Sequence, residues 1–423
     1  MQSSRKVAID ALLKVNNDLA YSNITLNNIL KNSELSTADK QFTTALFYGV
    51  LDRKITLDYV LGTLIKTPLS KVDSFTKEVL RVGLYQIMFM DKVPDSAAVN
   101  EAVKIIKASK KRHNAGFVNA VLRASTRQEK LIPDGNSVKE LSVRFSVPEW
   151  IVESFINDYS LEDTVSLLSE TLKPTPIYLR VNTLKIGVEE FLGELEKIGV
   201  KAEKTEQTGA VRLLDGFQIE TSELYKKGLF YVQDLSSQKC AQILGAQKGE
   251  RVLDICAAPG GKSFALAILM QNSGEILSCD LYEKRTNLIS TGAKRLGIDI
   301  IKTKTNDATA YNSEIGLFDA VLCDVPCSGL GIIRRKPDIK YKEIASFSDL
   351  EKIQSEILEN AVKYLKSGGR IVYSTCTLRQ NENEKQVEAF IQKHPEFELK
   401  YMHTFMPHID NTDGFFTALL LKR

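Results

Sequence analysis

The chain has 423 residues, a length that predicts two or three domains. Its composition, 43% hydrophobic and 26% charged, is typical of a globular protein with apolar cores. No stretch approaches the roughly eighteen uncharged apolar residues of a transmembrane helix, and the N-terminal residues lack the apolar centre of a signal peptide. Six cysteines in such a chain indicate a reducing compartment, so we expect a cytoplasmic protein with free thiols, not bound to a membrane.

The net charge of +3 hides an uneven distribution along the chain. Residues 1–140 contain 21 Lys or Arg and 14 Asp or Glu, a balance of +7, whereas the remainder contains 35 and 39, a balance of −4. A basic region in front of a mildly acidic one is typical of a handle for a polyanion. Surface lysines also serve solubility, so charge alone leaves nucleic-acid binding and a solvated surface equally open.

Residues 1 to about 140 have helical periodicity throughout. Apolar residues recur at helical spacing from Val7 to Val15, and Ser36 or Thr37 is expected to cap the following helix. The further amphipathic helices are expected at about 37–51, 54–66, 75–90, 96–110 and 114–126.

A basic cluster ends one of these helices and consists of Lys104, Lys107, Lys110, Lys111 and Arg112. Cations near a helix C-terminus complement its dipole. Five cations within nine residues exceed that need, which favours a patch that contacts phosphates. With "GFVNAVLR" at 116–123, this segment resembles the all-helical NusB family of RNA-binding domains.

Residues 145 to about 230 mix helical and strand patterns. "VPEWIVESFINDY" and "LEDTVSLLSETL" are helical, whereas "PIYLRVNTL" (176–184) alternates like a strand and is followed by the helical "GVEEFLGELEKIG". The order indicates a small α+β module, whose topology the periodicity does not define.

From about residue 235 onward, strands and helices alternate, which predicts an α/β fold with a doubly wound parallel sheet and a ligand at the carboxyl ends of its strands. The final "GFFTALLLKR" has no crossover helix before it, so we expect it to pair antiparallel, as in an S-adenosylmethionine methyltransferase sheet. The other strand candidates are 251–257, 275–281, 300–307, 318–325 and 370–377.

The segment "DICAAPGGKSFALA" follows a strand and opens a helix. A Walker A loop needs a glycine five residues before Gly261, where this chain has Cys256, and the segment is not GxGxxG. An Ala-Pro-Gly-Gly turn remains, which lets a ligand lie close to the backbone at a helix N-terminus.

Carboxylates end the strands that follow this turn. Asp280 lies nineteen residues beyond Gly261, the spacing at which an acid reaches ribose hydroxyls, and Asp307 and Asp324 end the next two strand candidates. Because carboxylates repel phosphates, the set predicts an adenosine-containing ligand without a phosphate chain.

The six cysteines fall into two groups. Cys327 and Cys376 follow strands on the rim that faces the expected ligand. Cys323 and Cys327 are separated by three residues, not the two of a CxxC zinc motif, and the four histidines lie far away in the sequence, so we expect no metal. The others lie in apolar contexts and are interpreted as structural: Cys240, Cys256, Cys279 and Cys323.

Two thiols beside a methyl donor indicate covalent chemistry, and methylation at C5 of a pyrimidine requires it. A thiolate that adds to C6 makes C5 able to attack the sulfonium methyl group, and an acid near N3 stabilises the charge on the ring. One thiol suffices for attack and a second could assist release. The residues alone do not decide which of Cys327 and Cys376 attacks.

At this point the motifs identify a family. "CAAPGGKS", "DVPCSGLG", "YSTCTL" and the terminal "DGFF" resemble the RNA (cytosine-5) methyltransferases of the Sun or NOL type over about 235–423. With the NusB-like front and "LRVNTL", the whole chain resembles the bacterial members that act on small-subunit ribosomal RNA.

The resemblance implies roles for individual residues. Cys376 would be the nucleophile, Cys327 would help release the product, and Asp324 would lie between cofactor and cytosine. Asp280 would hold the ribose of S-adenosylmethionine and Asp307 its adenine. The turn that lines the cofactor would consist of Cys256, Ala257, Ala258, Pro259, Gly260, Gly261 and Lys262.

Methylation of C5 requires an unstacked base, so the target is expected in a loop or flipped out of a helix. Arg334, Arg335, Lys336 and Lys340 follow the Pro-Cys segment and are expected to hold RNA phosphates near the site, although such a loop is more often merely solvated.

The sequence therefore predicts an all-α NusB-like RNA-binding domain at 1–140, a small α+β module at 145–234 and a Rossmann-like methyltransferase domain at 235–423. The expected partner is small-subunit ribosomal RNA, with no obligate protein partner inferred. The alternatives are a non-catalytic RNA-binding or antitermination protein and a methyltransferase for another RNA such as tRNA, for DNA or for protein.

Overall fold

The computed structural model describes residues 3–18, 22–128, 132–342 and 347–423. The chain forms two compact units. The helical unit runs to Leu172 and includes Lys336–Lys342, whereas the sheet unit contains Lys173–Arg335 and the C-terminal residues. Among the described residues, no helix combines the length and apolar character needed to cross a membrane.

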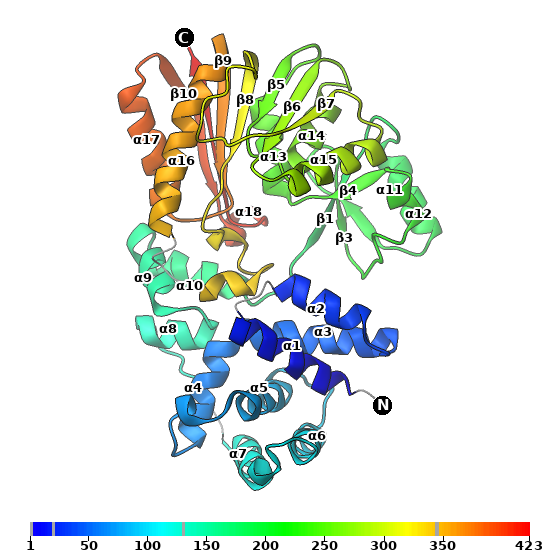
Figure 1. Ribbon diagram of the computed structural model, residues 1–423, viewed down its shortest axis with the longest axis vertical. Coiled ribbons are helices and arrows are strands. Elements are labelled where there is room, and N and C mark those ends of the chain that lie inside the picture. The colour runs from blue at the N-terminus through cyan, green and yellow to red at the C-terminus, as the bar shows by residue number, and fades with distance from the viewer. Residues whose placement is uncertain (1–2, 19–21, 129–131, 343–346) are drawn as a thin grey trace. The chain divides into compact units, whose positions relative to one another are not determined.

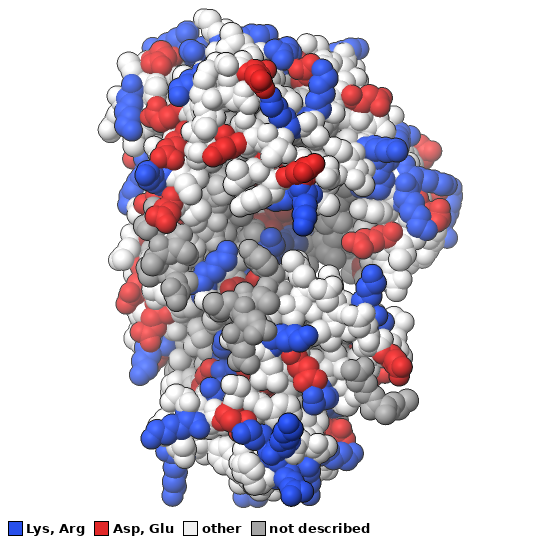
Figure 2. Space-filling view, viewed as in Figure 1, with Lys and Arg blue, Asp and Glu red and all other residues white. Residues whose placement is uncertain are grey.

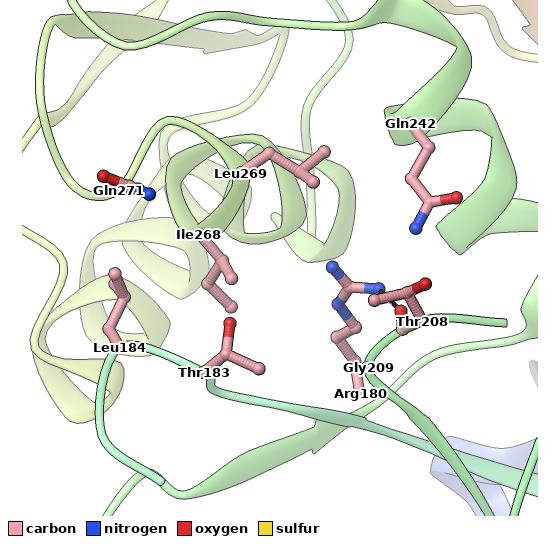
Figure 3. Close-up of a pocket in the computed structure, with 9 residues that line it drawn as sticks. All are labelled: Arg180, Thr183, Leu184, Thr208, Gly209, Gln242, Ile268, Leu269 and Gln271. Carbon is pink, nitrogen blue, oxygen red and sulfur yellow. Dashed lines mark hydrogen bonds between the residues drawn. The ribbon is translucent and has the colours of Figure 1, made fainter. Parts of the chain in front are cut away.

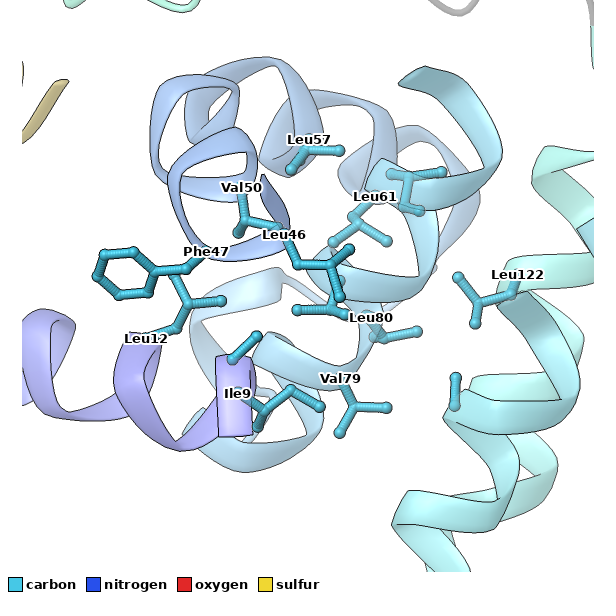
Figure 4. Close-up of a cluster of buried hydrophobic side chains, with 14 of the residues drawn as sticks. Ile9, Leu12, Leu46, Phe47, Val50, Leu57, Leu61, Val79, Leu80 and Leu122 are labelled. Atoms are coloured by element: carbon cyan, nitrogen blue, oxygen red, sulfur yellow. The ribbon is translucent and has the colours of Figure 1, made fainter. Parts of the chain in front are cut away.

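The helical unit is built around one apolar core (Figure 4), to which Leu12, Leu46, Leu57, Leu80 and Leu122 contribute. Ser36 caps α3, as expected, because its side chain accepts a hydrogen bond from the Asp39 amide. The helices are α1 (Ser4–Asp18), α2 (Ser22–Lys31), α3 (Thr37–Asp52), α4 (Lys54–Leu64), α5 (Ser74–Phe89), α6 (Asp95–Lys107), α7 (Ala115–Ser125), α8 (Val138–Phe145), α9 (Glu149–Asp158) and α10 (Leu161–Glu170).

A short segment from the C-terminal half of the sequence packs into the helical unit. Its 3₁₀ helix (Pro337–Tyr341) brings the Lys340 ammonium to the Asp52 carboxylate at 2.6 Å and the Tyr341 hydroxyl to the Leu51 carbonyl at 2.7 Å. The side chain of Lys340 is fully buried. The expectation that Lys340 holds an RNA phosphate is therefore wrong: its charge is neutralised inside the protein.

The sheet unit begins with a small antiparallel sheet in the order β2-β3-β1-β4. One face of β1 packs Leu179 and Val181 against α11 through a core that includes Phe191 and Phe230. The other face of β1 carries Tyr178 and Arg180. The elements are β1 (Ile177–Val181), α11 (Val188–Lys197), β2 (Ala202–Lys204), β3 (Ala210–Leu213), α12 (Glu223–Lys226) and β4 (Phe230–Val232).

A seven-stranded sheet follows in the order β10-β11-β9-β8-β5-β6-β7 (Figure 1). Strands β9, β8, β5, β6 and β7 are parallel, and β11 pairs antiparallel with both β9 and β10. The strands are β5 (Arg251–Asp254), β6 (Glu275–Asp280), β7 (Ile301–Thr305), β8 (Phe318–Asp324), β9 (Leu365–Thr375), β10 (Phe397–Phe405) and β11 (Phe415–Lys422).

Helices cover both faces of this sheet. Alternation along the strands sends Val252 and Leu322 to one face, where they pack against α13, α14 and α15, and Leu253 and Val321 to the other, against α16 and α17. These helices are α13 (Leu235–Leu244), α14 (Gly261–Leu269), α15 (Glu283–Leu296), α16 (Ser348–Ala361), α17 (Glu384–Lys393) and the short α18 (Pro407–Asp410). The predicted α/β sheet with an antiparallel last strand is confirmed.

Several elements were not predicted from the sequence. Helices α2 and α8 were not expected, and β10 fell within a stretch interpreted as irregular. Strand β10 is the edge of the sheet, and its central residues are exposed on both faces, so its sequence lacks the alternation that marks a half-buried strand.

Candidate active site

The donor turn (residues 256–261) connects β5 to α14 at the carboxyl edge of the large sheet. Gly260 has a φ of 109°, a backbone conformation that side chains with a Cβ rarely adopt, and a Cβ there would lie 2.6 Å from the Phe264 ring. The Ala258–Pro259 peptide is cis. The turn therefore packs closely against α14 at Gly260.

Asp280 ends β6 next to the donor turn and is 3% exposed. Its carboxylate accepts a hydrogen bond from the Ala258 amide at 3.3 Å and lies 3.2 Å from the guanidinium of Arg285. Arg285 also donates to the Ala258 carbonyl at 3.1 Å. These contacts bind the turn to the first part of α15, so Asp280 is adjacent to the turn, as expected from its spacing.

Asp254 lies beneath the donor turn and is completely buried. One carboxylate oxygen accepts a hydrogen bond from Ser263 at 2.6 Å, and Ser263 also contacts the Ser278 hydroxyl at 2.8 Å. The other oxygen is buried without a hydrogen-bond partner. Burial raises the pKa of Asp254 to about 7, the charge of Asp324 adds to the rise, and the Ser263 hydrogen bond opposes it.

Asp307 lies two residues beyond the end of β7 and is exposed. Its carboxylate accepts hydrogen bonds from the Thr309 amide at 2.9 Å and the Thr309 hydroxyl at 2.7 Å, which close the following turn. Its expected contact with adenine stays a prediction.

Lys262 and Asp324 form an ion pair at the centre of the site. The ammonium lies 2.7 Å from one Asp324 oxygen and 4.9 Å from the centre of the Phe415 ring, and Ser374 donates to the other Asp324 oxygen at 3.0 Å. Burial alone would lower the pKa of Lys262, but the charge and hydrogen bond of Asp324 and, to a smaller extent, the neighbouring thiols of Cys240 and Cys376 raise it, so the lysine stays cationic.

The thiols of Cys327 and Cys376 are in contact, with their sulfur atoms 3.3 Å apart. They come from the ends of the adjacent strands β8 and β9, and both side chains are partly accessible. The hydrogen bond to Cys376, burial, and the charges of Cys376 and Glu382 raise the pKa of Cys327 well above its usual value. The structure therefore brings together both thiols that the sequence placed on the ligand-facing rim.

The loop with Cys327 after β8 and the loop with Cys376 after β9 are called the cysteine loops. A close backbone contact joins them to the start of the C-terminal strand. The Gly331 amide donates to the Cys376 carbonyl at 3.0 Å, and the Gly414 amide donates to the Gly331 carbonyl at 2.9 Å. A Cβ on Gly331 would lie 2.0 Å from the Gly414 carbonyl oxygen. The glycines in "SGLG" and "DGFF" are thus needed for close approach of three backbone segments behind Cys376.

Glu382 connects the same loops from below and was not predicted. Its completely buried carboxylate accepts hydrogen bonds from the Ser328 amide at 2.8 Å and from the Gln354 side chain at 2.9 Å, and it pairs with Arg379 at 3.1 Å. The Ser328 and Thr377 hydroxyls are 2.7 Å apart. Each cysteine is therefore followed directly by a residue fixed in this network.

Two arginines expected to contact RNA are largely occupied by the protein's own carboxylates. Arg334 pairs with Asp413 at 3.2 Å and keeps 8% of its side chain exposed, while Arg335 pairs with both Asp413 and Asp234. Lys336, by contrast, is exposed. The arginines hold the loop after Cys327 against the C-terminal strand, a structural function that their positions in the sequence did not reveal.

The basic cluster of the helical unit occupies the end of α6 and the turn after it. Lys104, Lys107, Lys110 and Arg112 are exposed, and the ammonium of Lys104 lies 2.6 Å from Glu101. In Figure 2, Lys and Arg side chains gather over the α6–α7 end of this unit.

The remaining thiols lie in apolar surroundings. Cys240, Cys279 and Cys323 are completely buried, and burial raises the pKa of each; it raises that of Cys240 to about 11 and that of Cys279 to about 12. Cys256 is partly exposed at the start of the donor turn, and its pKa is also raised. A raised pKa disfavours the thiolate, which agrees with a structural interpretation of these four residues.

Comparisons with known proteins find three family models along the chain. Family models match residues 2–127 (NusB family), 147–220 (a ferredoxin-like domain of RsmF/B-like methyltransferases) and 241–421 (16S rRNA methyltransferase RsmB/F).

Similar proteins cover the whole length. A probable ribosomal RNA small subunit methyltransferase B from Bacillus subtilis (strain 168) is 38% identical over 100% of this chain and 99% of its own, and one from Synechocystis sp. (strain PCC 6803) is 34% identical over 100% of both chains. The crystal structure of PH0851 superposes with a TM-score of 0.83 at 27% identity, covering 100% of this chain and 99% of its own.

Proposed function

Because this chain belongs to the ribosomal RNA small subunit methyltransferase B family, whose members use S-adenosylmethionine to methylate ribosomal RNA, we propose that it methylates C5 of a cytosine through a covalent Cys376–C6 adduct. The observation that carries this proposal is the contact of the Cys327 and Cys376 sulfur atoms, 3.3 Å apart, beside the Lys262–Asp324 pair.

The residues at the carboxyl edge of the sheet support S-adenosylmethionine binding there. Asp280 is an acid at the end of the strand next to the donor turn, the position from which a carboxylate reaches ribose hydroxyls. The donor turn brings backbone close to the ligand at the N-terminus of α14. When bound, the cofactor supplies an electrophilic methyl group on a sulfonium.

Cys376 starts the reaction in this proposal. Its thiolate adds to C6 of the cytosine, and the electron pair displaced from the C5–C6 bond is shared with the ring nitrogen N3. The Lys262 ammonium lies within electrostatic range of Cys376, since a thiolate there raises the pKa of the lysine. A neighbouring cation stabilises a thiolate.

Asp324 faces the ring and the donor in the next step. Both of its oxygens are occupied, by Lys262 and by Ser374, which fixes the carboxyl group at the end of β8. With C6 bonded to sulfur, C5 is nucleophilic and attacks the methyl group, which leaves C5 with both a methyl group and a proton.

Cys327 acts last. Its high pKa means that a thiolate formed there would be a strong base. We assign it to product release: once its own proton has passed to solvent, the Cys327 thiolate takes the C5 proton, the electron pair of the C5–H bond re-forms the C5–C6 double bond, and the C6–S bond breaks to release the Cys376 thiolate. Without this step the enzyme stays attached to its RNA.

The exposed basic cluster of the helical unit supports a role in holding the ribosomal RNA. Its cations, Lys104, Lys107, Lys110, Lys111 and Arg112, would contact phosphates with Lys336. The NusB family model covers this segment.

Bisulfite sequencing of small-subunit ribosomal RNA tests the proposal. RNA from cells that lack the protein should contain one cytosine converted to uracil that stays unconverted in cells with the protein. Expression of the wild type should restore protection, and expression of Cys376→Ser should not. Identical conversion patterns in both strains, or methylation of another atom, would contradict a C5 methyltransferase.

A further inference from the structure

A cavity of about 410 Å³ lies where the small sheet meets α13 and α14, apart from the residues assigned to methyl transfer (Figure 3). Ligand cavities have volumes of about 300–1,000 Å³, so it is large enough for a small ligand. Ile268 and Leu269 form an apolar wall. The polar lining consists of Arg180, Thr183, Thr208, Gln242 and Gln271.

Arg180 forms the base of this cavity and is only 3% exposed. It extends from β1, and its guanidinium points between Thr208 and Gln242 (Figure 3). One terminal nitrogen donates to the Thr208 carbonyl at 2.6 Å and to the Gln238 side chain at 3.3 Å. Its Nε is buried without a hydrogen-bond partner.

The charge of this guanidinium is not neutralised by the protein. In the part of the chain that the structure describes, no carboxylate pairs with Arg180, and the cavity lining contains neither Asp nor Glu. Burial lowers the pKa of Arg180, and only the Tyr231 hydroxyl opposes this effect. Other arginines of this unit with little exposed side chain, such as Arg334 and Arg379, have acidic partners.

A buried cation without an anion is costly, and one that keeps a free donor beside a polar cavity is arranged to receive an anion. The hydroxyls of Thr183 and Thr208 and the amide of Gln242 add uncharged donors around it. Phosphate accepts several hydrogen bonds at once and matches the planar donors of arginine. We propose that this cavity is an oxyanion site that takes a phosphate group.

The phosphate could belong to the backbone of the substrate RNA, an assignment that rests on the proposed function, or to free inorganic phosphate. The surroundings favour RNA. Gln242 also lines an adjoining hollow that contains Lys239, Tyr401, His403 and Asp410, and Asp410 lies 3.3 Å from the ring of His403. A cation next to exposed aromatic rings is typical of surfaces that bind single-stranded nucleic acid.

Equilibrium dialysis of the full-length protein with radiolabelled inorganic phosphate, at constant ionic strength set with sodium chloride, tests the site without requiring catalysis. Wild type should bind phosphate saturably, with about one site removed by Arg180→Gln. Gln242→Glu keeps the shape of the side chain but supplies an internal carboxylate. It should weaken phosphate binding at least about tenfold, because the new carboxylate pairs with the Arg180 guanidinium in place of phosphate.

Two variants serve as matched controls. Arg212→Gln removes an exposed arginine of the same small sheet, and Gln247→Glu adds the same charge on the loop after α13; both should bind phosphate like wild type. Equal binding by Gln242→Glu and wild type would overturn the proposal, as would the absence of saturable binding in wild type. Gln242→Glu carries the test even if Arg180→Gln does not fold, which circular dichroism would reveal.

Competition identifies the source of the phosphate. If the site holds an RNA phosphate, inorganic phosphate should weaken RNA binding to wild type more than to Gln242→Glu at equal ionic strength. If wild type binds phosphate, but adding phosphate leaves the RNA affinity of both wild type and Gln242→Glu unchanged, the site serves free phosphate. Loss of phosphate binding in Gln242→Glu with normal 5-methylcytidine formation would separate this site from the methyl-transfer chemistry, so the two proposals can fail independently.

Discussion

The loops around Cys327 and Cys376 in the sheet unit and the basic cluster of the helical unit handle charge in opposite ways. Around the cysteine loops, Lys262, Arg334 and Arg335 are paired with carboxylates of the same unit. On the helical unit, Lys107 and Lys110 are exposed to solvent. Paired charges fix geometry, so their loss should damage the chemical steps, whereas exposed charges should act on affinity and on its salt dependence.

The largest effect is expected for the nucleophile. Cys376→Ser should lower methyl transfer by about 10³-fold or more, because a serine hydroxyl is a far weaker nucleophile than a thiolate. A radiolabelled methyl-transfer assay with ribosomal RNA measures this loss. Cys279→Ala removes a buried thiol of the same sheet and should keep nearly full activity; a similar loss in both variants would contradict a special role for Cys376.

Glu382→Gln should have the next largest effect. One carboxylate oxygen of Glu382 accepts hydrogen bonds from Ser328 and Gln354, and the other accepts one from Arg379. In the glutamine variant, the NH₂ group must replace one of these oxygens and will face a hydrogen-bond donor, which costs about 1–3 kcal/mol. Displacement of the Cys327 loop should slow turnover about tenfold or more. The KM for RNA should change little.

Glu388→Gln, an exposed change on α17, is the matched control for Glu382 and should leave turnover unaltered. If Glu382→Gln has wild-type kcat and only a lower thermal stability, then the glutamate supports the fold and does not position the cysteine loops.

A smaller effect is expected in the pH dependence of stability. The pKa of Asp254 is raised to about 7, so the folded protein holds a proton that the unfolded chain loses near pH 4. Its contribution to stability is therefore present at low pH and lost as pH rises through 7. The charges that act on it are Asp324, Lys262 and Asp280.

Urea unfolding at pH 5.5 and pH 8 measures this effect. Asp254→Asn cannot titrate, so its loss of stability between these two pH values should be smaller than that of wild type. An equal loss in both proteins would show that Asp254 is already ionised when folded.

The smallest effect belongs to the exposed cluster. Lys107→Gln combined with Lys110→Gln should weaken RNA binding by a few-fold and reduce the slope of log K against log salt concentration by about 1–2, since each phosphate contact contributes about 0.7–0.9. The kcat at saturating RNA should not change. Lys66→Gln combined with Lys71→Gln removes two other exposed lysines of this unit and should leave the slope unchanged. An equal reduction of the slope in both double variants would mean that the total charge of the unit, and not the basic cluster, determines RNA binding.

The site residues that lie at or just after the end of a strand were predictable from the sequence, because strand ends and glycine turns are local features of a sequence. The donor turn, Asp280, Asp324 and both rim cysteines lie where the motifs placed them. The family resemblance and the α/β methyltransferase fold are confirmed by the full-length relatives and the family models.

Features that depend on distant partners were not predictable. Lys340 was expected to hold an RNA phosphate, but it pairs with Asp52, which lies 288 residues away in the sequence. The network of Glu382 draws its donors from Ser328 and Gln354, 54 and 28 residues away. A local pattern records the charge of a side chain, not whether another part of the chain will neutralise it.

The central claim is the division of labour between the two thiols in contact. It is tested most directly by denaturing gel electrophoresis and intact-mass measurement of the protein after incubation with ribosomal RNA and S-adenosylmethionine. Cys327→Ser should accumulate a denaturant-resistant protein–RNA adduct, whereas Cys376→Ser and the double variant should form none. An adduct that persists in Cys376→Ser and disappears in Cys327→Ser would contradict the account, because it would make Cys327 the nucleophile.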